Sequence, residues 1–544
     1  MKKTTAIISR IVAAIATVLI GVGIYYLALP AWNWRNPAMW GFLLGIVTIG
    51  VIIQWIIDSM EYENYIGIKV GGIIFGILIL VLIIGGLTSA KMFNSTAYQH
   101  MVTIENGNFE EDINRIQNID NISIVDRITA EHLGNRTVGS ITNAAWYEVD
   151  NEYNLINYQG EQYRISALNY GGLFKFNKAK YEGIPGYVLV NVATQEAKYV
   201  QLENAIKYSP SAYFSFDLKR HLRSQYSSYI FGENFFEIDD AGNPYWITAV
   251  RVPTIGMFGG KKEQSFIITN ACTGENVEYK TEELPEWVDQ AYSLNYLMRI
   301  AGYNLTYVNG YWNAVFAKTN VVKTTYSFRS YGTEGESAFD GYNTAITADG
   351  EIVFYTGLTP ASNAETNVGF ILANPRTGVI TRYTCSGAEE SSAQASAESL
   401  VQDLKYEATF PTILNVDGEE TYFMLLKDKA GLVQRYALCN VENYTKVVQA
   451  TSLEEAVQKY LEKLGKETPE QEQEAIQGTI VELYEAQIDG CTYYYFKLEG
   501  SDNLYMSSIK NSNKQVLLKV GAKVSIEYVP TAEGDVYLIT KIQF

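Results

Sequence analysis

Three long apolar stretches dominate the first 90 residues of the chain. They cover residues 7–29, 39–57 and 70–88, and only the first holds a charged residue, Arg10. An α-helix needs about 20 apolar residues to cross a hydrocarbon core of about 30 Å. The pattern therefore predicts three transmembrane helices within residues 1–90.

The first stretch also has the basic start of a secretory signal peptide, with Lys2 and Lys3 ahead of it. We favour a permanent span, because the stretch is long, ends without a small-x-small cleavage site and is followed at once by two more apolar stretches.

The basic residues around the three stretches predict their orientation. Cytoplasmic loops carry an excess of Lys and Arg. Four basic residues fall on the side of the N-terminus and two on the other: Lys2, Lys3, Arg10 and Lys69 against Arg35 and Lys91. We therefore expect a cell-membrane protein with a cytoplasmic N-terminus and a large extracytoplasmic C-terminal region.

Beyond the third stretch, short runs of apolar residues recur, and each stops at an Asn. Three of them continue as Asn-x-x-Thr followed by Gly or Gln, and a fourth copy, at Asn440, lacks the Thr-Gly pair. Such a pattern is typical of two strands joined by a tight turn, because Gly readily adopts positive φ. We assign the following residues to structural turns: Asn191, Thr194, Asn270, Thr273, Gly274, Asn374, Thr377 and Gly378.

An extended segment precedes each of the first two turns. Residues 163–167 (Tyr-Arg-Ile-Ser-Ala) align with residues 245–249 (Tyr-Trp-Ile-Thr-Ala), and a helical stretch, 216–229, precedes the second. A unit of one helix, a hairpin and a third strand resembles the PepSY domain, an α/β module of exported bacterial proteins whose turn often reads Asp-x-x-Thr-Gly-Glu. Residues 270–275 are similar, with Asn in place of Asp. The resemblance implies a role in regulating cell-surface proteases, and four PepSY-like units, at residues 122–210, 211–290, 339–400 and 401–465.

Residues 291–338 are predicted to be an aromatic, helical insertion between the second and third units. Leu294, Leu297 and Ala301 keep the spacing of an amphipathic helix, and a stripe of aromatic residues follows. Such a stripe usually packs in a core. Tyr and Trp also favour interfaces, and the candidate interaction surface is Tyr307, Tyr311 and Trp312.

The remaining segments complete the expected organisation. Residues 91–121 are polar and are expected to be a juxtamembrane stalk, and residues 466–474 a charged linker. Residues 475–544 contain five or six short strands and resemble an OB-like β-barrel. OB barrels often bind oligonucleotides, but six Lys against eight acidic residues favour a structural or protein-binding role. The expected fold class is N-terminal transmembrane helices plus α+β, with repeated helix/antiparallel-sheet units and a small C-terminal all-β barrel.

The net charge and the cysteine content limit the classes of partner and of site that the chain is expected to have. The chain has 42 Lys and Arg against 60 Asp and Glu; the first 91 residues hold six and three of these, so residues 92–544 carry 36 against 57, a net charge of −21. Such a region repels phosphate backbones, so we expect a membrane and a protein partner but no nucleic acid. The four Cys are scattered without a CxxC pair, which indicates neither a disulfide scaffold nor a zinc site. Few cysteines in an exported region point to a bacterial cell envelope.

The sequence contains no catalytic motif. The three His lie in different segments, and neither a Gly-x-Ser-x-Gly elbow nor a phosphate-binding loop is present. The acidic turns at residues 239–243 and 417–420 are too short for an EF-hand. We therefore expect no catalytic residue, metal or cofactor, and interpret the chain as a membrane-anchored extracytoplasmic binding or regulatory protein. The alternatives are a structural subunit of an envelope assembly (secretion, conjugation or cell-wall machinery) and an exported hydrolase without a local motif.

Overall fold

The computed structural model falls into two units, Met1–Tyr460 and Leu461–Phe544, and each is described by itself. The structure describes residues 2–61, 66–113, 124–137, 139, 143–325, 341–347, 350–362, 366–466, 474–488, 491–501, 503–508, 518–530 and 536–543.

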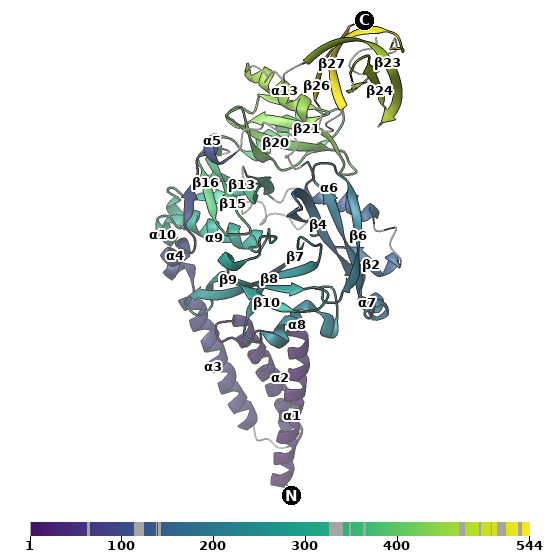
Figure 1. Cartoon of the computed structure of the whole chain (residues 1–544). Coiled ribbons are helices and arrows are strands. Elements are labelled where there is room, and N and C mark those ends of the chain that lie inside the picture. Colours follow the sequence, from purple (N-terminus) through teal and green to yellow (C-terminus); the bar gives the residue numbers. More distant parts are fainter. Residues whose placement is uncertain are drawn as a thin grey trace. The chain divides into compact units, whose positions relative to one another are not determined.

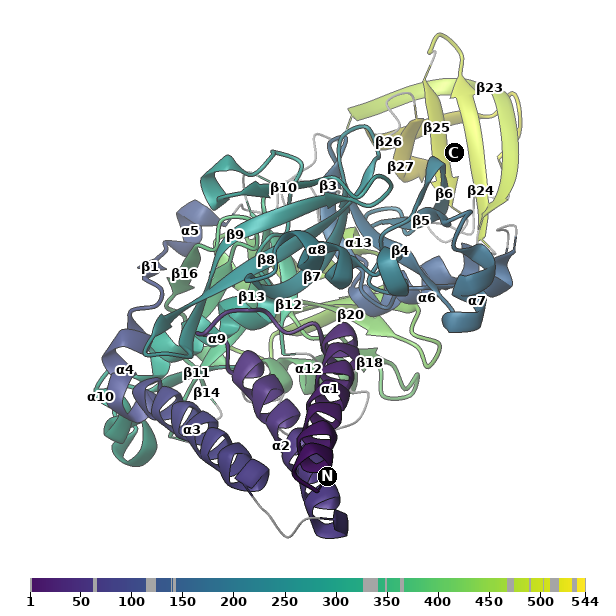
Figure 2. The same cartoon turned by 90° about the horizontal axis from the view of Figure 1, so that it is seen from below.

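Three helices, α1 (Lys2–Ala28), α2 (Pro37–Glu61) and α3 (Ile66–Thr88), open the first unit (Figure 1, Figure 2). Their segments Arg10–Ala28, Pro37–Ile57 and Gly67–Thr88 are long and apolar enough to cross a membrane. The prediction of three apolar helices is thus confirmed. Many of their side chains point outward, and Leu27 is 78% exposed. Apolar surface of this extent is stable in lipid and costly in water.

An α+β region with four antiparallel meanders follows the helices. In each meander, four strands pair with their neighbours in chain order. The first two are β3 (Asn154–Tyr158), β4 (Glu161–Tyr170), β5 (Ile184–Asn191) and β6 (Ala197–Ile206), then β7 (Ile230–Ile238), β8 (Pro244–Ile255), β9 (Gly259–Asn270) and β10 (Asn276–Tyr279). The other two are β12 (Asn343–Ile346), β13 (Ile352–Pro360), β15 (Gly369–Ala373) and β16 (Ile380–Tyr383), then β19 (Thr412–Val416), β20 (Glu419–Lys427), β21 (Val433–Asn440) and β22 (Val447–Ala450).

Short strands extend three of these sheets, and a further pair links two of them. β2 (Tyr147–Val149) pairs with β4, and β18 (Glu407–Ala408) pairs with β20. β11 (Val322–Thr324) pairs with β13, and β1 (Ile104–Asn106) runs parallel to β16. β14 (Thr366–Asn367) pairs with β17 (Gly387–Ala388).

Helices pack between successive sheets. α8 (Leu218–Gln225) shares a buried core with the first and second sheets, α9 (Leu294–Thr306) with the second and third, and α12 (Glu390–Ser399) with the third and fourth. The other α-helices among the described residues are α4 (Lys91–Gln99), α5 (Phe109–Asp112), α6 (Arg127–Thr137), α7 (Leu173–Ala179), α10 (Gly310–Trp312) and α13 (Leu453–Leu464).

Side-chain caps begin five of these helices, and four of the five caps share one geometry. Asp126, Asp217, Ser293 and Ser452 each accept the backbone N–H three residues later, at 2.7–3.2 Å. Such a bond satisfies one of the N–H groups that have no partner within the helix. Gly465, with φ +74°, follows the last residue of α13.

The two aligned segments hold the same register. Tyr163 is opposite Asn191 and Tyr245 is opposite Asn270, and the same correspondence continues two and four residues further along each strand. Side chains at corresponding positions of the two segments therefore point to the same face of their respective sheets.

Residues 91–121, expected to be a stalk, join the folded region as far as the structure describes them. The ring of Tyr98 in α4 packs edge-on against Tyr303 of α9, with centroids 5.0 Å apart. β1 completes an edge of the third sheet, which pairs its backbone groups and buries neighbouring apolar side chains. Residues 114–121 lie outside the described residues.

The insertion expected at residues 291–338 also belongs with the third sheet. It supplies the packed helix α9 and the edge strand β11, while residues 326–338 lie outside the described residues. Likewise, α12 precedes residue 401, where the fourth unit was expected to begin. Of the expected linker, residues 467–473 lie outside the described residues, and Glu474 begins a strand.

The second unit contains a closed barrel of five strands in the order β23-β24-β25-β27-β26. β25 and β27 pair in parallel, and the other neighbours are antiparallel. Its core includes Phe496, Tyr505 and Ile526, which are fully buried. The strands are β23 (Glu474–Ile488), β24 (Cys491–Leu498), β25 (Leu504–Ser508), β26 (Lys523–Pro530) and β27 (Val536–Gln543).

Candidate functional site

The Asn residues singled out from the sequence lie in turns of one design, each between the third and fourth strand of a meander. In three turns the Asn side-chain oxygen accepts the N–H groups two and three residues later, at 2.9–3.0 Å. The hydroxyl of Thr194, Thr273 or Thr377 then accepts the N–H two residues further on. The residue after each Thr has positive φ: +61° at Gln195, +78° at Gly274 and +76° at Gly378. The predicted turns are therefore closed by Asn side chains that bond their own backbone.

The residue after each turn Asn accepts a backbone hydrogen bond from the chain that enters the same meander. These bonds are 2.8–3.1 Å long, and a helix begins within eleven residues of each donor. The turn therefore contacts the chain ahead of each entering helix. The donors and acceptors are Ile124 to Val192, Lys207 and Tyr208 to Ala271, Ala291 and Tyr292 to Pro375, and Ala388 to Val441.

The third of these turns borders a polar cleft of about 300 Å³ between the first sheet, the third sheet and the segment that leads into α9, which we call the acidic cleft. Of the eight predicted turn residues, the structure brings only Asn374 into it. Its lining is Asn157, Glu286, Asp289, Gly350, Glu351, Ile352, Asn374 and Arg376.

Residues 284–292, which lead from the second sheet to α9, form one wall of the acidic cleft. The guanidinium of Arg376 donates to the carbonyl oxygens of Leu284 (3.2 Å), Pro285 (2.9 Å) and Glu286 (2.8 Å), and also to Val288. The guanidinium keeps its positive charge in these hydrogen bonds, and that charge lowers the pKa of Asp289 against the effect of burial.

Two carboxyl groups tie this wall to the first two sheets. Asp289 accepts the backbone N–H of Asn157 at 2.6 Å and its side-chain amide at 3.2 Å. Glu237, at the end of β7, accepts the N–H groups of Asp289 (2.9 Å) and Gln290 (2.7 Å). The wall is therefore held by contacts from three sheets.

Both carboxyl groups bind protons more tightly than usual. Burial raises the pKa of Glu237 well above its ordinary value, and the nearby charge of Asp289 raises it further. Burial also raises the pKa of Asp289 to about 6, against the hydrogen bonds from Asn157. In the lining, the three carboxyl residues Glu286, Asp289 and Glu351 outnumber the one cation, Arg376, so the acidic cleft suits the basic side chain of a partner. Among the residues that the structure describes, no group of three or more His, Cys, Asp or Glu could hold a metal ion.

The three residues of the candidate aromatic surface differ in how far they are exposed. Tyr307 is buried against Tyr98 and Ile255, and Tyr311 packs at the edge of the same cluster. Trp312 is 58% exposed, and its ring stacks on the exposed ring of Phe316 with centroids 5.7 Å apart. Of the three predicted residues, Trp312 is the one that offers surface to a partner or a membrane.

The sequence analysis did not single out Glu237, Asp289 or Arg376. Glu237 did leave a signal, because it is a carboxylate between Phe236 and Ile238 in an apolar run, and a charge in a buried strand needs a partner. The residues that flank Asp289 and Arg376 in the sequence give no comparable signal.

No protein-family model and no curated protein matches this sequence. The three apolar helices and the acidic cleft are therefore the features that support a function.

Proposed function

We propose that the chain is a membrane-anchored extracytoplasmic protein that binds a protein partner at the cell surface and regulates it. The observation that carries this proposal is the fastening of the apolar helices to the second sheet. Arg223 donates to the carbonyl of Leu29 (3.2 Å), Arg35 to that of Gly256 (2.9 Å), and the N–H of Phe258 to the hydroxyl of Ser89 (2.8 Å). Such an anchor holds the sheets in a fixed orientation to the membrane.

We infer that the four meanders are copies of one module similar to PepSY. The shared strand order, the Asn turns and the bond from the entering chain to the residue after each Asn support this inference. A regulatory role at the cell surface comes from that resemblance.

The strand order of the barrel supports an OB-type assignment for the second unit. Its first three strands are consecutive and its last two are exchanged, with the third and fifth strands parallel. A small Greek-key barrel of five strands has this strand order. We assign it a structural or protein-binding role, because residues 475–544 carry more acidic residues than Lys.

The acidic cleft sets the chemistry of the proposed partner. Glu286 and Glu351 are exposed at its border, and Asp289 lies deeper. A Lys or Arg side chain entering the cleft would form charge-assisted hydrogen bonds with these carboxylates. The partner would thus present a basic residue on an accessible loop.

Site-specific photocrosslinking in the native cell tests this function. A photoreactive amino acid replaces Glu286 in the full chain, and the matched control replaces Glu196, an exposed residue in the turn of the first sheet. We expect a discrete protein adduct from position 286, weaker adducts from position 196, and loss of the first adduct when Glu351→Gln is added. Equal adducts from both positions would contradict a partner in the cleft. Adducts from a third photoreactive position, in α3, without an adduct from position 286 would favour the structural-subunit alternative.

A further inference from the structure

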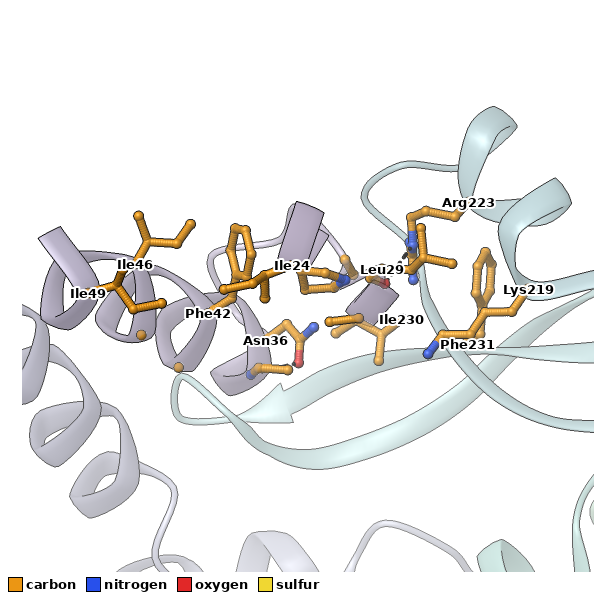
Figure 3. Close-up of a pocket in the computed structure, with 16 residues that line it drawn as sticks. Ile24, Leu29, Asn36, Phe42, Ile46, Ile49, Lys219, Arg223, Ile230 and Phe231 are labelled. Atoms are coloured by element: carbon orange, nitrogen blue, oxygen red, sulfur yellow. Dashed lines mark hydrogen bonds between the residues drawn. The ribbon is translucent and has the colours of Figure 1, made fainter. Parts of the chain in front are cut away.

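A second pocket, of about 440 Å³, lies where α1 and α2 meet α8 and β7 (Figure 3). None of its 16 lining residues, all in the described part of the chain, is acidic.

One end of this pocket is an apolar groove between two of the helices that could cross a membrane. Ile24 of α1 and Phe42, Ile46 and Ile49 of α2 line it (Figure 3). A Cβ atom added at Gly41 or Gly45 would meet no other atom within 4 Å. The two glycines thus leave space on the surface of α2 that a longer side chain would fill.

The other end of the pocket carries two cations from α8. Figure 3 shows Lys219 and Arg223 at the opposite end from Ile46 and Ile49. Arg223 is 5% exposed, and its Nε donates to the carbonyl of Leu29 at 3.2 Å. Its Nη1 donates to three further carbonyls at 2.6–3.1 Å, which hold the guanidinium in place. Lys219 is exposed and lies one helical turn before Arg223.

We propose that this pocket binds an anionic phospholipid, with an acyl chain in the groove between α1 and α2 and the phosphate at Lys219 and Arg223. The proposal rests on the membrane insertion proposed above. Cationic side chains next to a membrane attract anionic headgroups, and Arg and Lys bind phosphate oxygens through charge-assisted hydrogen bonds. An apolar groove joined to a cationic end matches both parts of such a lipid, whereas a soluble anion would leave the groove empty.

Native mass spectrometry of the purified full chain tests the site. The probes are phosphatidylglycerol and phosphatidylcholine with the same acyl chains, and sn-glycerol 3-phosphate as the headgroup without chains. We expect one phosphatidylglycerol to be retained in preference to phosphatidylcholine, and no glycerol phosphate. Lys219→Gln should weaken this retention about fivefold, the effect of one basic residue at an anionic membrane surface. The matched control, Lys429→Gln, removes an exposed lysine from the turn before β21 and should change nothing.

A pair of glycine variants distinguishes lipid bound in the groove from lipid bound elsewhere on the helices. Gly45→Leu should fill the groove and abolish retention, whereas Gly76→Leu on α3, where an added Cβ also meets nothing within 4 Å, should not. Equal retention of the two lipids, or equal behaviour of the two glycine variants, would overturn the proposal and leave only ordinary boundary lipid. Extraction of the parent chain from membranes by alkaline carbonate would instead refute the membrane insertion, so the two failures are distinguishable.

Discussion

The ring of Tyr292 lies against Gly378, so that a Cβ atom built on the glycine would come within 3.0 Å of Cε2 of the tyrosine. Tyr208 lies against Gly274 in the same way, with the corresponding distance 2.5 Å. Each tyrosine belongs to the chain that enters the meander whose turn it covers. The turn glycine is therefore required both for its positive φ and for the space above it.

Replacing Gly274 with Ala should destabilise the protein by more than the strain of positive φ alone. That strain costs about 1 to 3 kcal/mol, and the ring of Tyr208 must also move. Gly160→Ala is the matched control, since Gly160 has φ +83° but no atom within 4 Å of an added Cβ. Thermal unfolding of the detergent-solubilised chain measures both. Equal losses in the two variants would show that the tyrosine contact contributes nothing.

A buried ion pair joins the fourth sheet to the start of α6. Nζ of Lys427 lies 2.5 Å from each carboxylate oxygen of Asp126. Burial alone would raise the pKa of Asp126, but Lys427 and Thr129 hold it below its usual value. The lowered pKa of Asp126 therefore adds stability at neutral pH, and this contribution is lost as the pH falls through the folded-state pKa of Asp126. Burial also lowers the pKa of Lys427, which offsets part of the gain.

Lys427→Met should destabilise the protein by about 3 to 5 kcal/mol, because it leaves a buried carboxylate without its cation. Adding Asp126→Asn should restore part of the stability, since Asn can still cap α6. Chemical denaturation of the single and double variants measures the difference. A double variant no more stable than Lys427→Met would contradict the ion-pair account.

Glu390 should make stability depend on pH in the opposite direction. Burial raises its pKa to about 7, despite hydroxyl donors from Thr325 (3.2 Å) and Tyr355 (3.3 Å). Since the folded state binds this proton more tightly than the unfolded state, the stabilisation is complete at low pH and is lost as the pH rises through about 7.

Glu390→Gln should therefore flatten the pH profile of stability between pH 5 and 8, by roughly 1 to 3 kcal/mol across that range. Unfolding measured at several pH values tests this, with the exposed Glu407→Gln as the control. A Glu390→Gln profile as steep as that of the parent would refute the assignment.

The features that could be predicted from the sequence are those whose contacts are local. The Asn turns close within five residues, and the apolar spans need only length and composition. The acidic cleft could not be predicted, because Asn157 and Asp289 are 132 positions apart. β1 was not predicted, because it is only three residues long and pairs with β16, which is distant in the sequence. Likewise, nothing in the local sequence of Lys219 indicates that it lines the same pocket as Gly41 and Gly45 of α2.

The most direct test of the central claim is impermeant thiol labelling of the full chain on intact cells. In a background in which Ser replaces all four native Cys, Lys429→Cys reports on the fourth sheet and Ser59→Cys on the far end of α2; both positions are exposed. If the helices cross the membrane with the N-terminus in the cytoplasm, Lys429→Cys is labelled on intact cells and Ser59→Cys only after lysis. Labelling of Ser59→Cys but not Lys429→Cys on intact cells would contradict the account.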